Sequence, residues 1–142
     1  MVAQGEATSP AVQKVFDFVK SCNYYFLATT EGDQPRVRPF SSFVIYEGKI
    51  YFQTGKVKNV SKQILANPKI EICAYNGQGA WIRIQAVATE DDRVAAKQHM
   101  LDAFPELKTM YSADDGNTQV FYLKDATATY SSMGGEGWTE KF

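Results

Sequence analysis

Residues 36–42, which read RVRPFSS, place two arginines, a proline and an aromatic ring within one stretch that is predicted to be extended. Alternate residues of a strand share a face, so Arg36, Arg38 and Phe40 should point to the same side. This side would offer positive charge for an anion next to a flat apolar ring. Pro39 donates no backbone hydrogen bond, so we expect the ladder to open or bulge there and to leave nearby backbone groups for a ligand. Taken alone, the segment fits an edge strand with two solvated arginines better than it fits a binding site.

A second candidate lies at residues 53–62, where a strand is predicted to end and a helix to begin. The first N–H groups of a helix have no partner inside it, and the positive end of its dipole attracts anions. The glycine spacing of a Walker loop is absent. By itself, a stretch with three lysines is usually an ordinary exposed loop. Its charged and hydrogen-bonding residues are Gln53, Thr54, Lys56, Lys58, Asn59, Ser61 and Lys62.

The two segments are more informative together, because they belong to successive predicted strands joined by a tight turn at Glu47 and Gly48. The start of the first strand and the end of the second should therefore lie close in space. One segment would supply arginines and an opened strand, and the other would supply a phosphate site. A ligand with a planar ring and a phosphate tail would fit both.

The elements that would position these segments are mostly strands joined by short turns. Such turns imply an antiparallel sheet, and closing the sheet into a barrel would remove its exposed edges. We therefore expect a mainly β (α+β) fold, a six-stranded antiparallel β-barrel with a few flanking helices. Strands are predicted at residues 24–30, 35–46, 49–54, 69–75, 80–90 and 118–130, helices at 10–22, 57–66 and 91–104, a short helical turn at 107–111, and a loop at 131–142.

The composition argues against several classes of protein. The chain has the length of one domain, residues 1–142, and its hydrophobic fraction of 44% is enough for one core. Fifteen basic and 16 acidic residues leave no strong field of one sign, which argues against nucleic-acid binding. Two cysteines and one histidine, His99, argue against a protein-ligated metal, and we expect His99 to be structural. Nothing reads as a signal peptide or a membrane span, so we expect a cytoplasmic protein that binds no membrane.

The order and spacing of the motifs resemble the pyridoxamine 5'-phosphate oxidase-like FMN-binding superfamily, the split β-barrel flavoproteins. The resemblance extends over roughly residues 16–130 and is carried by residues 23–75, NYYFLATTEGDQPRVRPFSSFVIYEGKIYFQTGKVKNVSKQILANPKIEICAY. Within the superfamily, the chain is most similar to the small nitroimidazole-reductase-like proteins, through GDQPRVRPF and WIR. The resemblance implies a homodimer that binds FMN non-covalently at its interface.

The resemblance also implies roles for particular residues. Arg38 matches the position that meets the flavin or its phosphate, and the backbone of residues 39–41 would face the isoalloxazine ring. Residues 53–54 would lie near the flavin and the ribityl chain, and residues 58–59 would bind the phosphate. Residues 79–81 would approach the flavin from the other subunit. The predicted cofactor-binding residues are Arg36, Arg38, Pro39, Phe40, Ser41, Gln53, Thr54, Lys58, Asn59 and Trp81.

Two departures from the superfamily bear on the activity. Nothing in the tail, which reads SSMGGEGWTEKF, matches the B6-binding arginine and histidine of the true oxidases. We therefore do not expect a pyridoxamine 5'-phosphate oxidase. Relatives of the nitroimidazole-reductase type often carry a histidine near the flavin, whereas the sole histidine here is His99, in a predicted helix. We expect no side chain to act as an essential acid or base.

Three hypotheses about function follow. The first is an FMN-dependent oxidoreductase that reduces a small molecule, with a nitro compound as one candidate and a transiently bound nicotinamide as the electron donor. The second is a flavin protein without catalysis, such as a carrier, a store or a sensor. The third keeps the fold but exchanges the ligand for haem or a deazaflavin. Haem would need an axial His, Cys, Met or Tyr in the cleft, and the single histidine makes haem less attractive.

Overall fold

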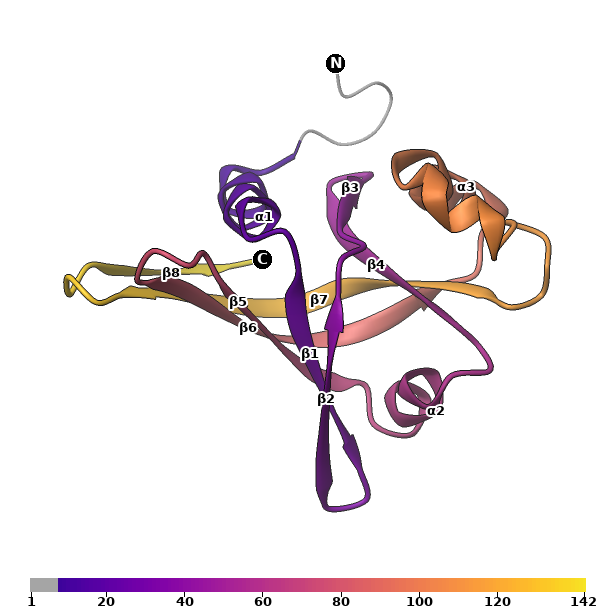
Figure 1. Cartoon of the computed structure of the whole chain (residues 1–142), viewed down its shortest axis with the longest axis horizontal. Coiled ribbons are helices and arrows are strands. Elements are labelled where there is room, and N and C mark those ends of the chain that lie inside the picture. The colour runs from indigo at the N-terminus through magenta and orange to yellow at the C-terminus, as the bar shows by residue number, and fades with distance from the viewer. Residues whose placement is uncertain (1–7) are drawn as a thin grey trace.

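The computed structural model describes residues 8–142 and contains one antiparallel sheet flanked by helices (Figure 1). The strand order is β2-β1-β5-β6-β7-β4-β3, and β8 pairs with β7. The predicted fold class, mainly β with flanking helices, is confirmed. The elements in chain order are α1 (Pro10–Ser21), β1 (Tyr25–Glu31), β2 (Gln34–Phe40), β3 (Val44–Tyr46), β4 (Lys49–Gly55), α2 (Asn59–Ala66), β5 (Lys69–Tyr75), β6 (Ala80–Asp91), α3 (Val94–Ala103), the 3-10 helix η1 (Pro105–Thr109), β7 (Thr118–Ser132) and β8 (Gly137–Lys141).

Alternation along the strands determines which side chains form the core. In β6, Ile82 and Ile84 are fully buried, whereas Arg83 on the opposite face is exposed. The face of β6 that carries these isoleucines therefore belongs to the core. At the N-terminal end of α1, the Val12 N–H donates to the Ser9 hydroxyl (3.2 Å), so Ser9 caps this helix.

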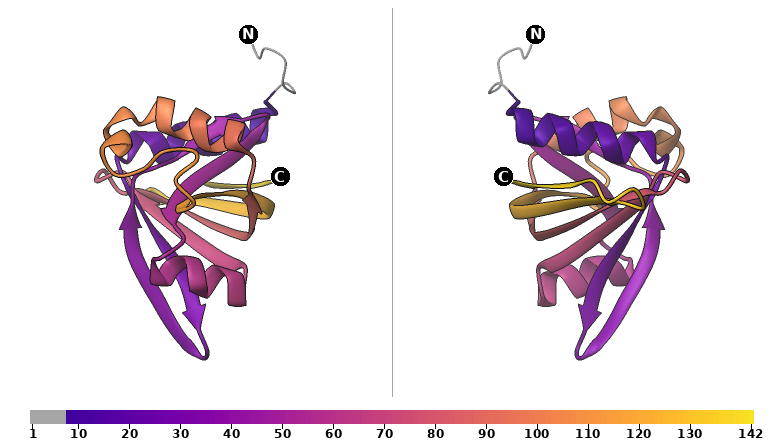
Figure 2. Two further views of the ribbon diagram at one scale, coloured as in Figure 1. Left: turned by 90° about the vertical axis from the view of Figure 1, so that its right-hand side faces the viewer. Right: turned by 90° about the vertical axis from the view of Figure 1, so that its left-hand side faces the viewer.

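The helices lie at different sides of the molecule, although the buried side chains of α1 and α2 belong to one core cluster. Two turned views place α1 and α3 along one side of the molecule and α2 on the opposite side (Figure 2). The β1–β2 hairpin projects from the body next to α2, with its turn at Gly32 in the left-handed region (φ +63°). No helix within residues 8–142 is both long enough and apolar enough to cross a bilayer.

The stretch predicted as one strand at residues 35–46 forms two strands, β2 and β3. These are consecutive in the chain but stand at opposite ends of the strand order, and no ladder joins them. Residues 41–43 cross between them, and the Gln53 N–H donates to the Ser42 Oγ (3.0 Å) and ties this crossing to β4. The sheet thus has eight strands and is not closed, so the six-stranded barrel is not confirmed. The stretch divides because its first half pairs with β1 and its second half with β4.

The edge position of β2 explains how this strand accommodates proline. Its ladder with β1 continues through Pro39, which lies opposite Phe26, and ends at Phe40. The opening expected at Pro39 therefore lies one residue later, after Phe40. An edge strand needs ladder bonds on one side only, so a proline nitrogen that faces the free side removes no hydrogen bond.

The tail predicted as a loop at residues 131–142 is instead largely strand, and that prediction is wrong. β7 continues to Ser132, and β8 folds back along it. The Trp138 ring stacks on Tyr130 with centroids 5.0 Å apart, and the Lys14 ammonium lies 4.2 Å from the Trp138 ring centre. These contacts hold the tail against β7 and α1.

Candidate functional site

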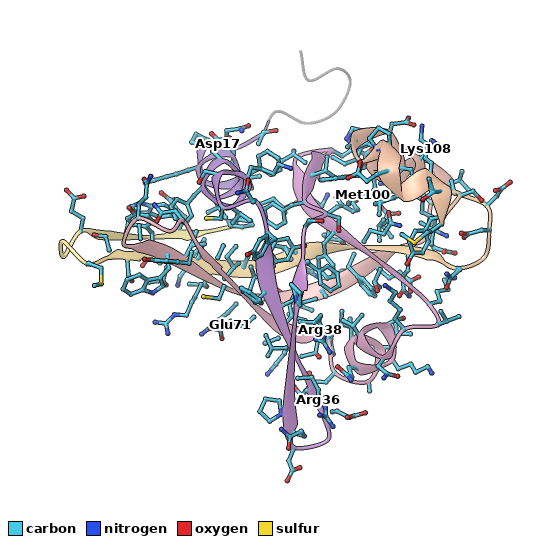
Figure 3. All side chains as sticks on the ribbon, in the orientation of Figure 1. Asp17, Arg36, Arg38, Glu71, Met100 and Lys108 are labelled. Carbon is cyan, nitrogen blue, oxygen red and sulfur yellow. The ribbon has the colours of Figure 1, made fainter. Side chains whose placement is uncertain are left out.

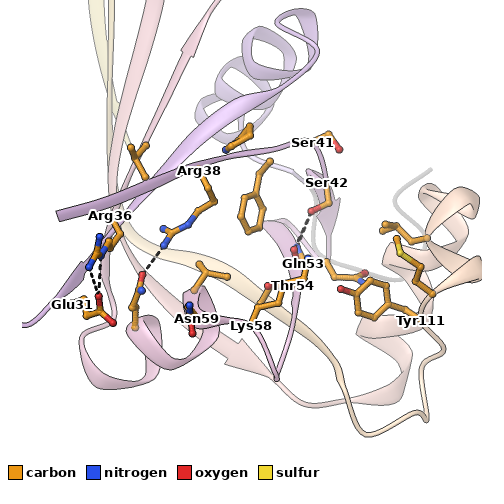
Figure 4. A pocket seen from close by; sticks show the side chains of 17 residues that line it. Glu31, Arg36, Arg38, Ser41, Ser42, Gln53, Thr54, Lys58, Asn59 and Tyr111 are labelled. Atoms are coloured by element: carbon orange, nitrogen blue, oxygen red, sulfur yellow. Dashed lines mark hydrogen bonds and ion pairs between the residues drawn. The ribbon is translucent and has the colours of Figure 1, made fainter. Parts of the chain in front are cut away.

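A cleft of about 700 Å³ opens between β2, the end of β4, the start of α2 and η1 (Figure 4). Arg36 and Arg38 reach it from the β1–β2 hairpin, which Figure 3 shows extending away from the body. The two segments that the sequence singles out, residues 36–42 and 53–62, thus both line this one cleft. Nine of the ten predicted cofactor-binding residues line it: Arg36, Arg38, Pro39, Phe40, Ser41, Gln53, Thr54, Lys58 and Asn59.

Gln53 and Thr54, at the end of β4, are buried polar side chains that line this cleft. Gln53 is only 6% exposed and Thr54 only 4%. Within residues 8–142, the Gln53 Nε2 and Oε1 atoms and the Thr54 Oγ1 have no hydrogen-bond partner. Leaving a buried polar group without a partner costs about 1–3 kcal/mol. The fold itself therefore leaves the hydrogen bonding of these three atoms, in residues that line the cleft, unsatisfied.

Arg38 is held in place by its neighbours. Its guanidinium donates to the Gln63 Oε1 (2.6 Å), the Thr29 Oγ1 (2.8 Å) and the Leu27 carbonyl oxygen (3.2 Å). Burial, and then the positive charge of Arg36, lower the pKa of Arg38. The guanidinium therefore presents a fixed positive charge to the cleft.

Arg36, by contrast, lies near the tip of the hairpin and is more exposed. It forms an ion pair with Glu31 (2.8 Å) in which both side chains are about half exposed. Pairs of this kind add little stability because water screens them. Arg36 is thus free to turn toward a ligand.

The start of α2 forms the cationic part of the cleft. Lys58 precedes the helix, no side chain caps it, and the Lys58 N–H bonds to the Gly55 carbonyl oxygen (3.0 Å). Lys58 and Asn59 are exposed, and both line the cleft. Among the other lysines of the stretch, Lys56 forms an ion pair with Asp92 (3.8 Å), and neither Lys56 nor Lys62 lines the cleft.

One wall of the cleft comes from a segment that the sequence did not single out. Leu107, Met110 and Tyr111, in and just after η1, line the side that faces α2 and β4. Met110 is 70% exposed, which is high for a large apolar side chain. The sequence predicts a helical turn here. It does not predict that this turn lies next to the end of β4, which is about 50 residues earlier in the chain.

Trp81 is the predicted site residue that does not line the cleft of its own chain. It lies on β6 opposite Tyr75 of β5 and Ser131 of β7, and it is half-buried. It shares the outer face of the sheet with Arg83. His99, also outside the cleft, is exposed and packs its ring on Tyr46, with centroids 4.7 Å apart.

The chain is similar to known proteins along most of its length. The family model described as pyridoxamine 5'-phosphate oxidase matches residues 11–132. A NimC/NimA family protein from Clostridium acetobutylicum has 42% sequence identity and a TM-score of 0.90, over 93% of this chain and 92% of that chain. A pyridoxamine 5'-phosphate oxidase-related, FMN binding protein from Nostoc punctiforme has 15% identity and a TM-score of 0.61, over 96% and 99%. A heme binding protein from Mycobacterium smegmatis has 16% identity and a TM-score of 0.66, over 96% and 59%.

These similarities differ in what they show. No curated protein matches the sequence. The flavin-binding and haem-binding neighbours, at 15% and 16% identity, show a shared fold alone. The family match and the relative at 42% identity extend over most of the chain. The chain therefore belongs to the pyridoxamine 5'-phosphate oxidase-like family.

Proposed function

We propose that the protein binds FMN in this cleft and uses it to reduce a small molecule with electrons from a nicotinamide donor. The observation that carries the proposal is the pair Gln53 and Thr54, whose buried polar atoms have no partner within residues 8–142. These atoms lie in the same cleft as a lysine and an uncapped helix start. An FMN-binding neighbour of the same fold supports this choice of ligand.

The residues of the cleft fit the parts of FMN. Lys58, Asn59 and the first N–H groups of α2 would bind the phosphate, because a helix start favours an anion. The Gln53 amide offers a donor and an acceptor, which suits the ribityl hydroxyls or the polar edge of the ring. The backbone of residues 39–41, around the end of the ladder at Phe40, would face the ring. Bound FMN would supply the electron transfer, while the chain binds it and orients it.

The apolar wall would receive the substrate. Leu107, Met110 and Tyr111 offer apolar and aromatic surface facing the polar side of the cleft. A small planar acceptor would fit between this wall and a flavin ring. The resemblance of the sequence to nitroimidazole-reductase-like proteins makes a nitro compound the acceptor to test first.

We further propose a homodimer that joins through the outer face of the sheet. Phe26 and Tyr75 are 43% and 56% exposed, and the register of β1, β5 and β6 places them on the same face as Trp81. Exposed apolar side chains on neighbouring strands are typical of a surface that a partner covers. In such a dimer, the partner subunit would bring its residues 79–81 toward the cleft, as the resemblance implies.

Haem is the second candidate ligand, and a specific feature favours it over a deazaflavin. Tyr111 and Met110 lie on the cleft wall, and both residue types ligate haem iron in proteins. The positive charge of Lys58 and Arg38 would suit the haem propionates. The fold is shared with a heme binding protein, although at 16% identity.

The test is a titration of ligand-free protein with FMN, riboflavin and haemin, followed by absorption and gel filtration. We expect a flavin spectrum that remains with the protein, and tighter binding of FMN than of riboflavin because only FMN carries the phosphate. A haem spectrum with no retained flavin would replace the proposal by the second candidate. Binding of neither ligand would overturn the assignment of the cleft.

A second assay separates an enzyme from a flavin carrier or sensor. The FMN-loaded protein is mixed with NADH or NADPH without oxygen, and a nitroaromatic acceptor is then added. Bleaching of the flavin followed by repeated turnover on addition of acceptor is the expected result. Retained flavin that no nicotinamide reduces would favour the carrier or sensor.

A further inference from the structure

The loop before β7 contacts the phosphate side of the cleft through one residue, Asn117. Its carbonyl oxygen accepts a hydrogen bond from the Lys56 N–H (2.8 Å), and its Oδ1 accepts one from the Val57 N–H (3.2 Å). Two successive N–H groups directly before Lys58 are therefore held by a residue about 60 positions later in the chain. Asn117 itself does not line the cleft.

Asp115 holds Asn117 in this position. Its carboxylate accepts hydrogen bonds from the N–H groups of Ser112 (3.0 Å), Asn117 (2.8 Å) and Thr118 (2.7 Å). The Thr118 side chain adds a further bond to the same carboxylate (3.1 Å). The Asp115 carboxylate thus ties the loop together and links it to Thr118, the first residue of β7.

A glycine lets this loop approach the end of β4. A Cβ atom built on Gly55 would come within 3.1 Å of the Asn117 Nδ2 and of the Tyr111 hydroxyl oxygen. Such distances are tighter than nine in ten real Cβ contacts, so a side chain at position 55 would push Asn117 or Tyr111 away by a few tenths of an ångström. The lack of a side chain at Gly55 therefore allows the close contact between the loop and the residues that precede α2.

The bonds from Asn117 determine which backbone groups stay free. The N–H groups of Lys56, Val57 and Lys58 all have acceptors within the fold. The next two, of Asn59 and Val60, have none among residues 8–142. Fixing the first three groups orients the following two, and both of these residues line the cleft.

We infer that Asn117 is a positioning residue for the phosphate site and sets the preference of the cleft for a phosphorylated flavin over an unphosphorylated one. This inference rests on the proposed function. Asn117 touches no part of the ligand. It acts by holding the Val57 N–H, so that the free N–H groups at the start of α2 and the Lys58 side chain converge on one phosphate.

The test compares two asparagines that make the same bond in different places. Asn67 is half-buried like Asn117, and its Oδ1 accepts from the Lys69 N–H at the same distance, 3.2 Å, at the far end of α2. Asn117→Ala and Asn67→Ala each remove one such bond, so their thermal stabilities should fall by similar amounts. The dissociation constants for FMN and for riboflavin are then measured for both variants and the wild type.

We expect Asn117→Ala to weaken FMN binding about fivefold, the usual effect of one hydrogen bond, and to leave riboflavin binding unchanged. Asn67→Ala should change neither constant. Hydrogen exchange of the ligand-free Asn117→Ala protein should be faster at residues 56–58, whose N–H groups are bonded, and unchanged in β4. Asn117→Asp, which keeps an acceptor oxygen, should retain slow exchange at these residues.

The outcomes separate this inference from the proposed function. Equal loss of FMN and riboflavin affinity in Asn117→Ala, or no loss of either, would overturn the positioning role. Unchanged exchange at residues 56–58 would overturn it as well, even if the variant were too unstable to titrate. Wild-type protein that binds no flavin would instead overturn the proposed function, and with it the basis of this inference.

Discussion

Tyr51 and Gln53, two residues apart on β4, are both buried, but their polar groups differ in hydrogen bonding. The buried Tyr51 hydroxyl donates to the Asp91 carboxylate (2.6 Å), and the Arg93 guanidinium donates to Asp91 (2.8 Å) and to Glu47 (2.7 Å). Gln53 is equally buried, yet its amide has no partner within residues 8–142. The first group is complete without a ligand and joins β4 to the end of β6, whereas the second is incomplete and opens on the cleft.

The electrostatics of the completed group agree with a structural role. The hydrogen bonds from Arg93, with a smaller contribution from Tyr51, hold the pKa of Asp91 well below its usual range. Burial, together with the bond to Asp91, raises the pKa of Tyr51. Both groups therefore keep one protonation state near neutral pH, which suits a permanent contact and gives no proton-transfer function.

Removal of the Asp91 carboxylate should have the largest effect on stability and would sharpen this contrast. Asp91→Ala leaves the buried Tyr51 hydroxyl without an acceptor, and we expect a loss of about 3 kcal/mol in the free energy of unfolding. Denaturant titration measures this loss. Asp102→Ala, which removes an exposed pair with Lys108, should cost less than about 1 kcal/mol. Similar costs for the two variants would contradict the structural role given to Asp91.

Acid should weaken the same contact. The folded-state pKa of Asp91 lies below that of the unfolded chain, which is about 3.9 for an aspartate. Its contribution is therefore fully present above about pH 5 and is lost as the pH falls through the folded-state value. The difference in unfolding free energy between the wild type and Asp91→Asn should shrink below about pH 4. A difference that is constant from pH 7 to pH 3 would exclude this linkage.

Arginine and lysine in the cleft should respond differently to truncation. Lys58→Ala should weaken FMN binding about tenfold without changing stability, because the exposed ammonium would bond only the ligand. Arg38→Ala should lower both affinity and stability, since Gln63 and Thr29 lose the bonds from the guanidinium and keep only the bond to each other. Lys62→Ala, one turn further along α2 and outside the cleft, is the matched control. Fluorescence titration and thermal denaturation give the two readouts, and unchanged FMN affinity in Lys58→Ala would move the phosphate elsewhere.

The smallest expected effect on stability has the opposite sign. Gln53→Leu and Thr54→Val replace partnerless polar atoms with apolar groups of similar size, so the ligand-free protein should gain about 1 kcal/mol or slightly less. Binding of FMN should weaken in both variants. Unfolding curves measured with and without FMN give both the gain in stability and the loss of FMN binding. Destabilisation of the ligand-free protein by both substitutions would mean that these atoms already have partners, such as ordered water.

The sequence correctly predicts those parts of the cleft whose elements are close together in the chain. Arg38 and Lys58 belong to successive strands and the helix that follows, so local patterns were enough to bring them together. Tyr111 was missed because its place depends on the long-range contact between its loop and Gly55. The break after Phe40 was missed for a similar reason, since each half of the predicted strand follows a different distant partner.

The tail illustrates a further limit of reading the sequence. Three glycines, including Gly134 and Gly135, favour a loop at residues 131–142. β8 forms nevertheless, because Trp138 stacks on Tyr130 of β7, and this contact depends on the neighbouring strand and not on local propensity. Tertiary packing therefore stabilises β8 as a strand, although the local composition predicts a loop.

The free edge of β2 has a consequence for how the protein behaves at high concentration. An exposed strand edge can recruit an unpaired strand of another chain and seed aggregation. Pro35 and Pro39, four residues apart on this edge, cannot donate to such an incoming strand. The hairpin can therefore project into solvent and still remain a poor template for intermolecular β-sheet, which keeps the approach to the cleft open.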